Sequence, residues 1–191
     1  MLDVAPPLPP LEWVKTDRLW FAPMRPEDLL AVDVQDSQAT FLGLDAAPDE
    51  ETALNLASQP VAWTAWRRDG TVLACFGFNE AFPGKHGTAW ALLGKAIGRD
   101  HLALTRFVRE VVQGCTLDRL DVLARSSDYG PGIGGMSAAL ADPTPEVRWC
   151  LMLGFEPAHV LRKFGGAGET YMMLERIAAS GSAAIGHEVM P

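Results

Sequence analysis

The clearest pattern in the chain is a pair of apolar segments, residues 61–66 and 71–78, separated by a short polar stretch that ends in Asp69 and Gly70. Asp-Gly accepts the positive φ angles of a tight reversal, so the two segments are predicted to form a β-hairpin. A stretch rich in turn residues, 79–87, is expected to be a loop. The segment after it, residues 88–93, is almost continuously apolar, which is typical of a strand covered on both faces.

Beyond Gly94 the apolar spacing changes to that of an amphipathic helix with one buried face. The buried stripe consists of Leu102, Leu104, Phe107, Val108, Val111 and Val112. Shorter helices are predicted to begin near Pro26 and Pro48, because proline in the first turn of a helix leaves no amide without a partner. Another helix is predicted over residues 146–153, ending at Gly154, which accepts the left-handed conformation of a helix cap.

Further strands are expected at residues 19–24, 120–124, 159–164 and 170–175. The resulting order, β-α-α-β-β-β-α-β-α-β-β, combines a meander with a helical crossover. It predicts an α/β (α+β) protein with a mixed, mostly antiparallel central sheet that is flanked by helices on both faces.

The length of 191 residues fits one domain, predicted over residues 18–177. Residues 1–17 are expected to be an extended proline-rich arm, and residues 178–191 a flexible tail of small and polar residues. Inside the domain, residues 126–145 are rich in glycine and proline. They are expected to form a flexible loop that covers a cleft.

The charge balance narrows the classes of function. The formal net charge is −8 and the sequence pI is about 4.9, which argues against a nucleic-acid partner because duplex binding needs a clustered basic excess. The sequence shows neither an apolar stretch long enough for a membrane span nor the start of a secretory signal. Cys75, Cys115 and Cys150 are odd in number and widely spaced, so neither disulfides nor a metal site is expected, and a cytoplasmic location fits best.

Two segments of the chain resemble the GNAT (acyl-CoA N-acyltransferase) superfamily over roughly residues 20–176. The first is residues 90–93 with the following loop and the helix from His101, and the second is residues 146–155, which end in Leu-Gly-Phe. The resemblance implies transfer of an acetyl group from acetyl-CoA to a small-molecule or peptide amine. It also implies that the central strand and its neighbour diverge, so that backbone groups bind the pantetheine arm and stabilise an oxyanion.

The resemblance places the acyl-CoA site at the end of the central strand. It implies contacts from Ala91, Leu92, Leu93, Gly94, Lys95, Gly98 and Arg99. The family pattern Gln/Arg-x-x-Gly-x-Gly/Ala corresponds here to residues 95–100, Lys-Ala-Ile-Gly-Arg-Asp, so the pyrophosphate-binding motif is degenerate. Asp100 puts a carboxylate near the phosphates, and two unit charges 4 Å apart repel by about 1 kcal/mol in water and about 4 kcal/mol at an interface. Alternatively, Asp100 is the N-cap of the helix.

The catalytic residues implied by the resemblance also depart from the family pattern. Cys150 stands where many members have a tyrosine that protonates the leaving thiolate, and Pro143 stands near the family's asparagine. Cys150 is either a proton donor or a small hydrophobic residue of the core. Glu80 and His86, ahead of the central strand, are the candidates for a base that deprotonates the amine, or else they are solvated loop residues.

Two functions therefore stay open. One is an N-acetyltransferase that uses acetyl-CoA. The other is a catalytically silent GNAT-like structural or interaction protein of a tailed bacteriophage or prophage. It is suggested by the tryptophan in the central strand, by the six tryptophans of the chain and by the departures at Asp100, Pro143 and Cys150. The second function implies association with virions and a phage-protein partner, and a homodimer is possible for either.

Overall fold

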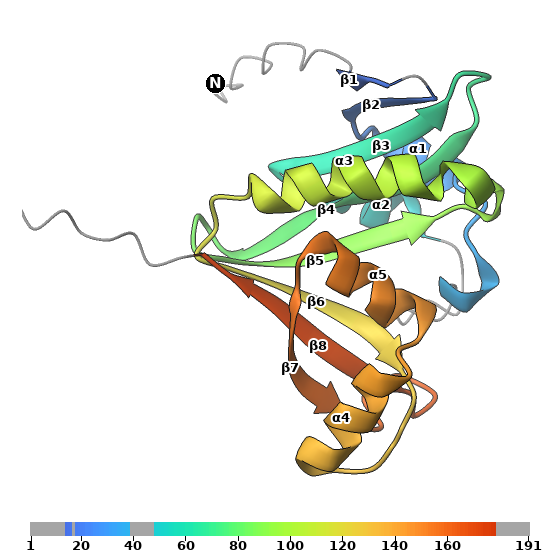
Figure 1. The fold of residues 1–191 in the computed structure, drawn as a ribbon. Coiled ribbons are helices and arrows are strands. Elements are labelled where there is room, and N and C mark those ends of the chain that lie inside the picture. The colour runs from blue at the N-terminus through green and yellow to red at the C-terminus, as the bar shows by residue number, and fades with distance from the viewer. Residues whose placement is uncertain (1–13, 17, 39–47, 179–191) are drawn as a thin grey trace, which may run out of the picture.

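The computed structural model describes residues 14–16, 18–38 and 48–178. Most of the predicted N-terminal arm and nearly all of the predicted C-terminal tail lie outside the described residues. The described residues form one eight-stranded sheet in the order β1-β2-β3-β4-β5-β6-β8-β7 (Figure 1). The strands are β1 (Val14–Lys15), β2 (Leu19–Pro23), β3 (Val61–Arg67), β4 (Val72–Phe82), β5 (His86–Leu93), β6 (Arg119–Ser126), β7 (Glu156–Leu161) and β8 (Thr170–Ile177).

Neighbouring strands are antiparallel except for β5 and β6, which are parallel. Helices α1 (Pro26–Ala31) and α2 (Glu50–Ala57) lie on one face of the sheet, while α3 (His101–Gln113) and α5 (Pro145–Leu153) cover the other (Figure 1). The predicted mixed, mostly antiparallel sheet with helices on both faces is confirmed.

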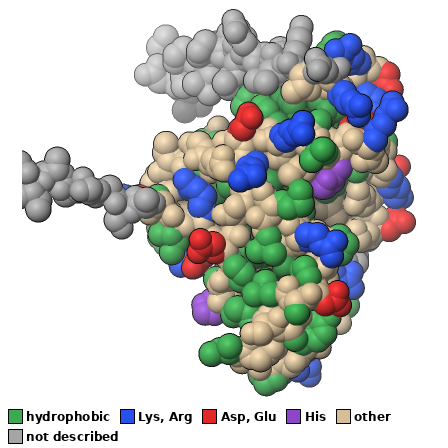
Figure 2. Space-filling view, in the orientation of Figure 1, with side chains coloured by type: hydrophobic (Ala, Val, Ile, Leu, Met, Phe, Trp, Pro, Cys, Tyr) green, Lys and Arg blue, Asp and Glu red, His purple; other side chains and the backbone are tan. Residues whose placement is uncertain are grey.

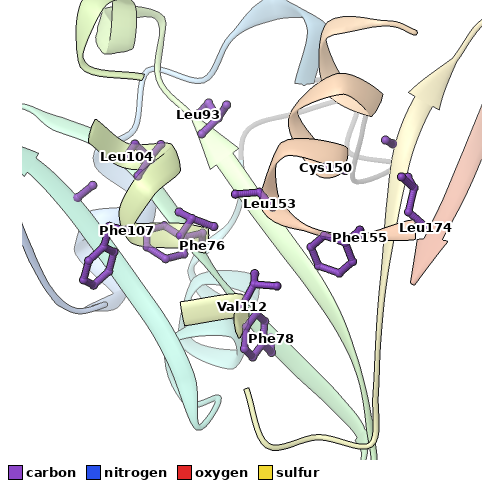
Figure 3. Packing of buried hydrophobic residues seen from close by; sticks show 14 of the residues in the cluster. Phe76, Phe78, Leu93, Leu104, Phe107, Val112, Cys150, Leu153, Phe155 and Leu174 are labelled. Carbon is purple, nitrogen blue, oxygen red and sulfur yellow. The ribbon is translucent and has the colours of Figure 1, made fainter. Parts of the chain in front are cut away.

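The larger core lies between the sheet and the α3–α5 face, and Phe107 of α3 is one of its residues (Figure 3). The ring of Phe107 stacks on Phe21 at a centroid distance of 3.8 Å and meets Phe76 edge-on at 6.1 Å. On the opposite face, Trp90 and Leu92 of β5 pack under α1 and α2 in a second core. The central strand is therefore covered on both faces, as its apolar sequence predicts.

Local signals define helix α5 well. The Thr144 side chain accepts a hydrogen bond from the amide of Val147, Pro145 is the first helical residue, and Gly154 ends the helix with φ 97°. The predicted Asp-Gly reversal also forms, with φ 87° at Gly70 between β3 and β4. These elements agree with the sequence because their determinants lie within a few residues of each other.

The expectation of a flexible loop over residues 126–145 is wrong, because helix α4 (Gly132–Ala141) forms within it and packs near β7. Pro131 fixes the backbone ahead of the helix, and the Ala-rich second half favours helical structure. Gly135 is buried, and any side chain there would collide with the carbonyl of Gly130. Glycine at this position allows close packing. Composition alone does not show whether a glycine serves close packing or makes a loop flexible.

Three boundaries also differ from the predictions. Strand β4 continues to Phe82 and β5 begins at His86, so the expected loop over 79–87 is reduced to a short turn. Val14 and Lys15, expected in the arm, form a short strand beside β2, and β7 begins at Glu156 rather than at residue 159. In each case pairing with a neighbouring strand extends the element beyond its own apolar pattern.

The aromatic contacts of Phe107 give a stability prediction. Phe107→Ala should lower the free energy of unfolding by about 3 to 5 kcal/mol, because it leaves a cavity against three aromatic partners. Denaturation in urea measures the change. Leu102→Ala, on the same helix but 54% exposed, is the control and should change stability by less than about 0.5 kcal/mol; equal losses in the two variants would contradict the described packing.

Candidate active site

Strands β5 and β6 are paired over the first part of their length and diverge beyond it. Within the described strands, their pairing runs from His86 with Arg119 to Ala89 with Val122 and stops there. Each strand keeps its other neighbour: β4 stays paired with β5 as far as Leu93, and β8 stays paired with β6 as far as Ser126. The sheet thus consists of two complete halves that separate beyond Ala89, which is the divergence that the resemblance implies.

A cavity of about 340 Å³ lies where the two halves separate, which is within the size range of small-molecule sites. The strands contribute Ala91, Leu93, Leu123 and Ala124 to its wall, the helices contribute His101, Pro145, Glu146, Trp149 and Cys150, and the segment after α1 contributes Gln35, Ser37 and Gln38. Of the residues predicted from the sequence, the structure brings Ala91, Leu93 and Cys150 to this cavity. Leu92 faces the opposite core.

The segment from Asp33 to Gln38 runs antiparallel to the end of β5. The amide of Lys95 donates to the carbonyl of Asp33 at 2.8 Å, and the amide of Gln35 donates to the carbonyl of Leu93 at 2.9 Å. The backbone then turns into a short 3₁₀ helix, η1 (Asp36–Gln38). Sequence analysis missed this segment because nothing local marks a residue for contact with a strand more than fifty positions away.

The side chain of Gln38 continues the pairing on the edge of β5 that faces the cavity. The amide of Leu93 donates to Oε1 of Gln38 at 2.7 Å, and Nε2 of Gln38 donates to the carbonyl of Ala91 at 3.2 Å. Together with Gln35, this side chain fills part of the slot that the divergence opens. The described edge of β5 is thus partly paired within the chain itself.

His101 lies at the start of α3 and lines the cavity, with its ring centroid 5.6 Å from that of Trp149. The hydroxyl of Thr105 donates to the carbonyl of His101 at 2.8 Å and accepts from Nε1 of Trp149 at 2.9 Å, so the two rings are held together. Partial burial lowers the pKa of His101 below its usual value. The imidazole is therefore neutral at pH 7.

Cys150 lies on α5 against the same cavity and is almost fully buried. Burial, with a smaller contribution from the negative charge of Glu146, raises the pKa of the Cys150 thiol to about 12. The thiol therefore stays protonated at neutral pH and is a poor nucleophile. This favours the interpretation of Cys150 as a packing residue.

Asp100 is buried and forms an ion pair with Arg67 of β3. Both Nε and Nη2 of Arg67 donate to Oδ2 of Asp100, at 3.0 and 2.9 Å, and Nη2 also donates to the carbonyl of Ala96 at 2.7 Å. Asp100 occupies the N-cap position of α3, as predicted, but its side chain makes no capping hydrogen bond, so the expectation that its own oxygen satisfies the helix amides is wrong. Arg67 neutralises the carboxylate, which removes most of the repulsion expected toward a phosphate.

The turn between β5 and α3 is a 3₁₀ helix, η2 (Lys95–Asp100), broken at Gly98, where φ is 36° and ψ is −121°. A side chain at Gly98 would meet open space, so the backbone conformation rather than crowding requires glycine there. Nζ of Lys95 lies 2.8 Å from Asp36 and 3.6 Å from Asp33. Lys95, predicted to contact the cofactor, thus forms ion pairs with Asp36 of η1 and with Asp33 just before it, while Arg99 is exposed.

Glu80 and His86 lie toward the other end of β5. Glu80 accepts a hydrogen bond from the amide of Gly84 at 2.8 Å in the β4–β5 turn. Nε2 of His86 lies 2.8 Å from Oδ2 of Asp121, in the half where β5 and β6 are paired. Five residues of strand, about 16 Å, separate His86 from Ala91, so the structure does not bring Glu80 or His86 to the cavity.

The surface around the site has one further feature. Apolar side chains are exposed over the region of α4 and α5 (Figure 2). They include Ile133 of α4, which is 84% exposed, and Met152 of α5, which is 46% exposed.

In the part of the chain that the structure describes, there is no helix that is both long and apolar enough to cross a membrane.

No family model and no curated protein matches the sequence. Solved structures do match the fold. An acetyltransferase of the GNAT family from Bacillus anthracis has a TM-score of 0.57 and 13% identity, covering 86% of this chain and 98% of that one. Ard1 from Thermoplasma volcanium has a TM-score of 0.59 and 11% identity, with 85% and 99% covered.

A third similar structure is yncA from Salmonella typhimurium, solved with its cofactor acetyl-CoA. It has a TM-score of 0.56 and 14% identity, and covers 86% of this chain and 98% of that one. The chain therefore has the fold of the GNAT acetyltransferases. These likenesses give no support to the predicted phage or prophage origin, nor to association with virions.

The Arg67–Asp100 ion pair gives a second prediction. Arg67→Ala should lower the free energy of unfolding by about 2 to 3 kcal/mol, because it leaves the buried Asp100 carboxylate without its partner while Arg67 itself is partly exposed. Thermal or urea denaturation checks this. Arg68→Ala, at the exposed neighbouring position, is the control. The double variant Arg67→Ala/Asp100→Asn should recover part of the loss, and a purely additive result would count against the pairing.

Proposed function

We propose that the protein is an N-acetyltransferase that moves the acetyl group of acetyl-CoA to a primary amine in the cavity between β5 and β6. The observation that carries the proposal is the divergence of these strands beyond Ala89 and Val122, with a cavity at the point where they separate. The fold likeness to acetyltransferases supports it, as does the acetyl-CoA bound to one of them.

The residues at the end of β5 suit an elongated thioester. The edge of β5 carries the amide of Leu93 and the carbonyl of Ala91, which pair with Gln38 in this structure and match the amides of a pantetheine arm. Beyond Gly94, the open backbone at Gly98, the start of α3 and the exposed side chain of Arg99 suit a pyrophosphate, because amides and the dipole at a helix N-terminus favour anions. Leu92 would take no part, because its side chain is buried on the other face and its backbone groups point toward β4.

When bound, acetyl-CoA supplies an acyl carbon bonded to a good leaving group. The nitrogen of a neutral amine forms a bond to that carbon, the carbon–sulfur bond breaks, and the sulfur leaves as the thiolate of CoA, which then takes up a proton. The chain has to receive the proton that the amine releases. Glu80 and His86 lie too far from the cavity for this role, so we assign it to the neutral imidazole of His101.

Glu146, also on the cavity wall, carries a negative charge that would attract a cationic amine before it is deprotonated. The net charge of −8 acts in the same direction over a longer range. We therefore propose an acceptor with a primary ammonium group, either a small molecule or a peptide.

Binding of acetyl-CoA is the first test of the proposal. Isothermal titration calorimetry with acetyl-CoA and CoA should show saturable binding at a ratio of one ligand per chain. Adenosine, which lacks both the pyrophosphate and the pantetheine arm, is the matched control and should bind far more weakly. Absence of heat at millimolar acetyl-CoA would remove the transferase assignment.

The role of His101 makes a prediction about pH. Because burial lowers the pKa of His101, the imidazole is neutral at pH 7 and becomes protonated, and inactive as a base, only at a pH below the one at which an ordinary histidine titrates. For a given amine, kcat/KM should therefore fall on the acidic side through this pKa. His101→Gln should lower kcat by about 100-fold or more and remove this limb, as measured by release of the CoA thiol.

His159→Gln, at an exposed position on β7, is the matched control and should keep both the rate and the pH profile. If His101→Gln lowered the rate but left the acidic limb in place, His101 would have only a structural role beside Trp149.

A further inference from the structure

The edge of β5 that faces the cavity is paired with a primary carboxamide. Oε1 of Gln38 accepts from the amide of Leu93 and Nε2 donates to the carbonyl of Ala91, at 2.7 and 3.2 Å. The orientation of the carboxamide is determined by its partners, because Leu93 offers a donor and Ala91 an acceptor. One side chain thus satisfies two backbone groups that a neighbouring strand would satisfy elsewhere in the sheet.

These are also the groups that an amide-bearing ligand would need. A secondary amide presents one C=O and one N–H, which is the same pair that Gln38 presents to Leu93 and Ala91. The cavity lies directly against both backbone positions and against Gln38 itself. A ligand amide and the Gln38 side chain therefore cannot occupy this edge together.

The segment that carries Gln38 is attached to β5 and the following turn by few polar contacts, so a ligand can replace the Gln38 side chain on this edge. Its two main-chain links to β5 and the following turn are the hydrogen bonds from Gln35 to Leu93 and from Lys95 to Asp33. Its ion pairs from Lys95 to Asp33 and Asp36 are exposed to solvent, and exposed ion pairs are weak and screened by salt. The carboxamide is thus seated on the edge by a small number of polar contacts.

We propose that Gln38 is an internal competitor for the acyl-CoA site, which occupies the amide-pairing edge of β5 and is displaced by the pantetheine arm. This inference rests on the proposed function. Gln38 would then set the affinity for acetyl-CoA. The smaller the fraction of molecules in which the edge is vacant, the higher the apparent dissociation constant. Each ligand hydrogen bond at the edge replaces one made by Gln38.

The test compares CoA binding by the wild-type protein, Gln38→Ala and Gln59→Ala in calorimetry. Gln38→Ala should bind CoA about 10-fold more tightly, the change expected when two ordinary hydrogen bonds no longer have to be broken. Gln59→Ala is the matched control: Gln59 bonds Asn55 on α2, away from the cavity, and its loss should leave the affinity unchanged.

The outcomes separate the two proposals. If the wild type binds CoA and Gln38→Ala binds it equally or more weakly, Gln38 is part of the binding site rather than a competitor, and the inference is wrong while the proposed function stands. If neither protein binds CoA, both fail together.

Hydrogen exchange of the wild-type protein provides a measurement that does not depend on how the variant folds. Saturating CoA should speed the exchange of the Gln35 and Gln38 amides, because Gln35 loses its bond to Leu93 and Gln38 loses its bond within the η1 turn. Slower exchange of these two amides on binding CoA would overturn the inference.

Discussion

The candidate site exists because β5 and β6 stop pairing beyond Ala89 and Val122. Each strand is fully paired on its other side, β5 with β4 and β6 with β8, so each half of the sheet is complete. The halves share only the pairing from His86 to Ala89 within the described strands. Beyond that point the facing backbone groups need other partners, because an unpaired amide or carbonyl that is shielded from water is costly. The cavity, the Gln38 contact and the proposed acyl-CoA site all follow from this requirement.

The proposed site consists largely of backbone groups, so it requires few particular side chains. The backbone groups at Ala91 and Leu93, which pair with Gln38 in this structure, are present with almost any side chain that fits the strand. The similar structures share 11 to 14% of residues with this chain. Side chains that the family pattern leads one to expect are replaced here at Asp100 and Cys150, while the strand divergence remains.

The partners of Asp100 and Cys150 change the interpretation of both replacements. Asp100 looked unfavourable for a phosphate, but Arg67 neutralises it from a neighbouring part of the sheet and also holds the carbonyl of Ala96 in η2. Cys150 occupies the position of a proton donor, but its thiol is buried with a raised pKa. His101 combines a position on the cavity wall with a lowered pKa. The chemistry that we propose for the site therefore rests on different side chains from those that the motif suggested.

The sequence by itself determined the elements whose causes are local. The Asp-Gly reversal, the apolar stripe of α3 and the caps of α5 at Thr144 and Gly154 each depend on residues a few positions apart, so their spacing predicts them. Helix α4 was not predicted, because a glycine that close packing requires, such as Gly135, cannot be distinguished in the sequence from a glycine in a loop. Only the tertiary structure decided that Arg67 meets Asp100, that Gln38 pairs with Leu93 and that Glu80 and His86 lie far from the cavity. These contacts and separations join or divide residues that are far apart in the sequence, so they depend on how the strands and helices assemble and not on the periodicity of the residues within any one element.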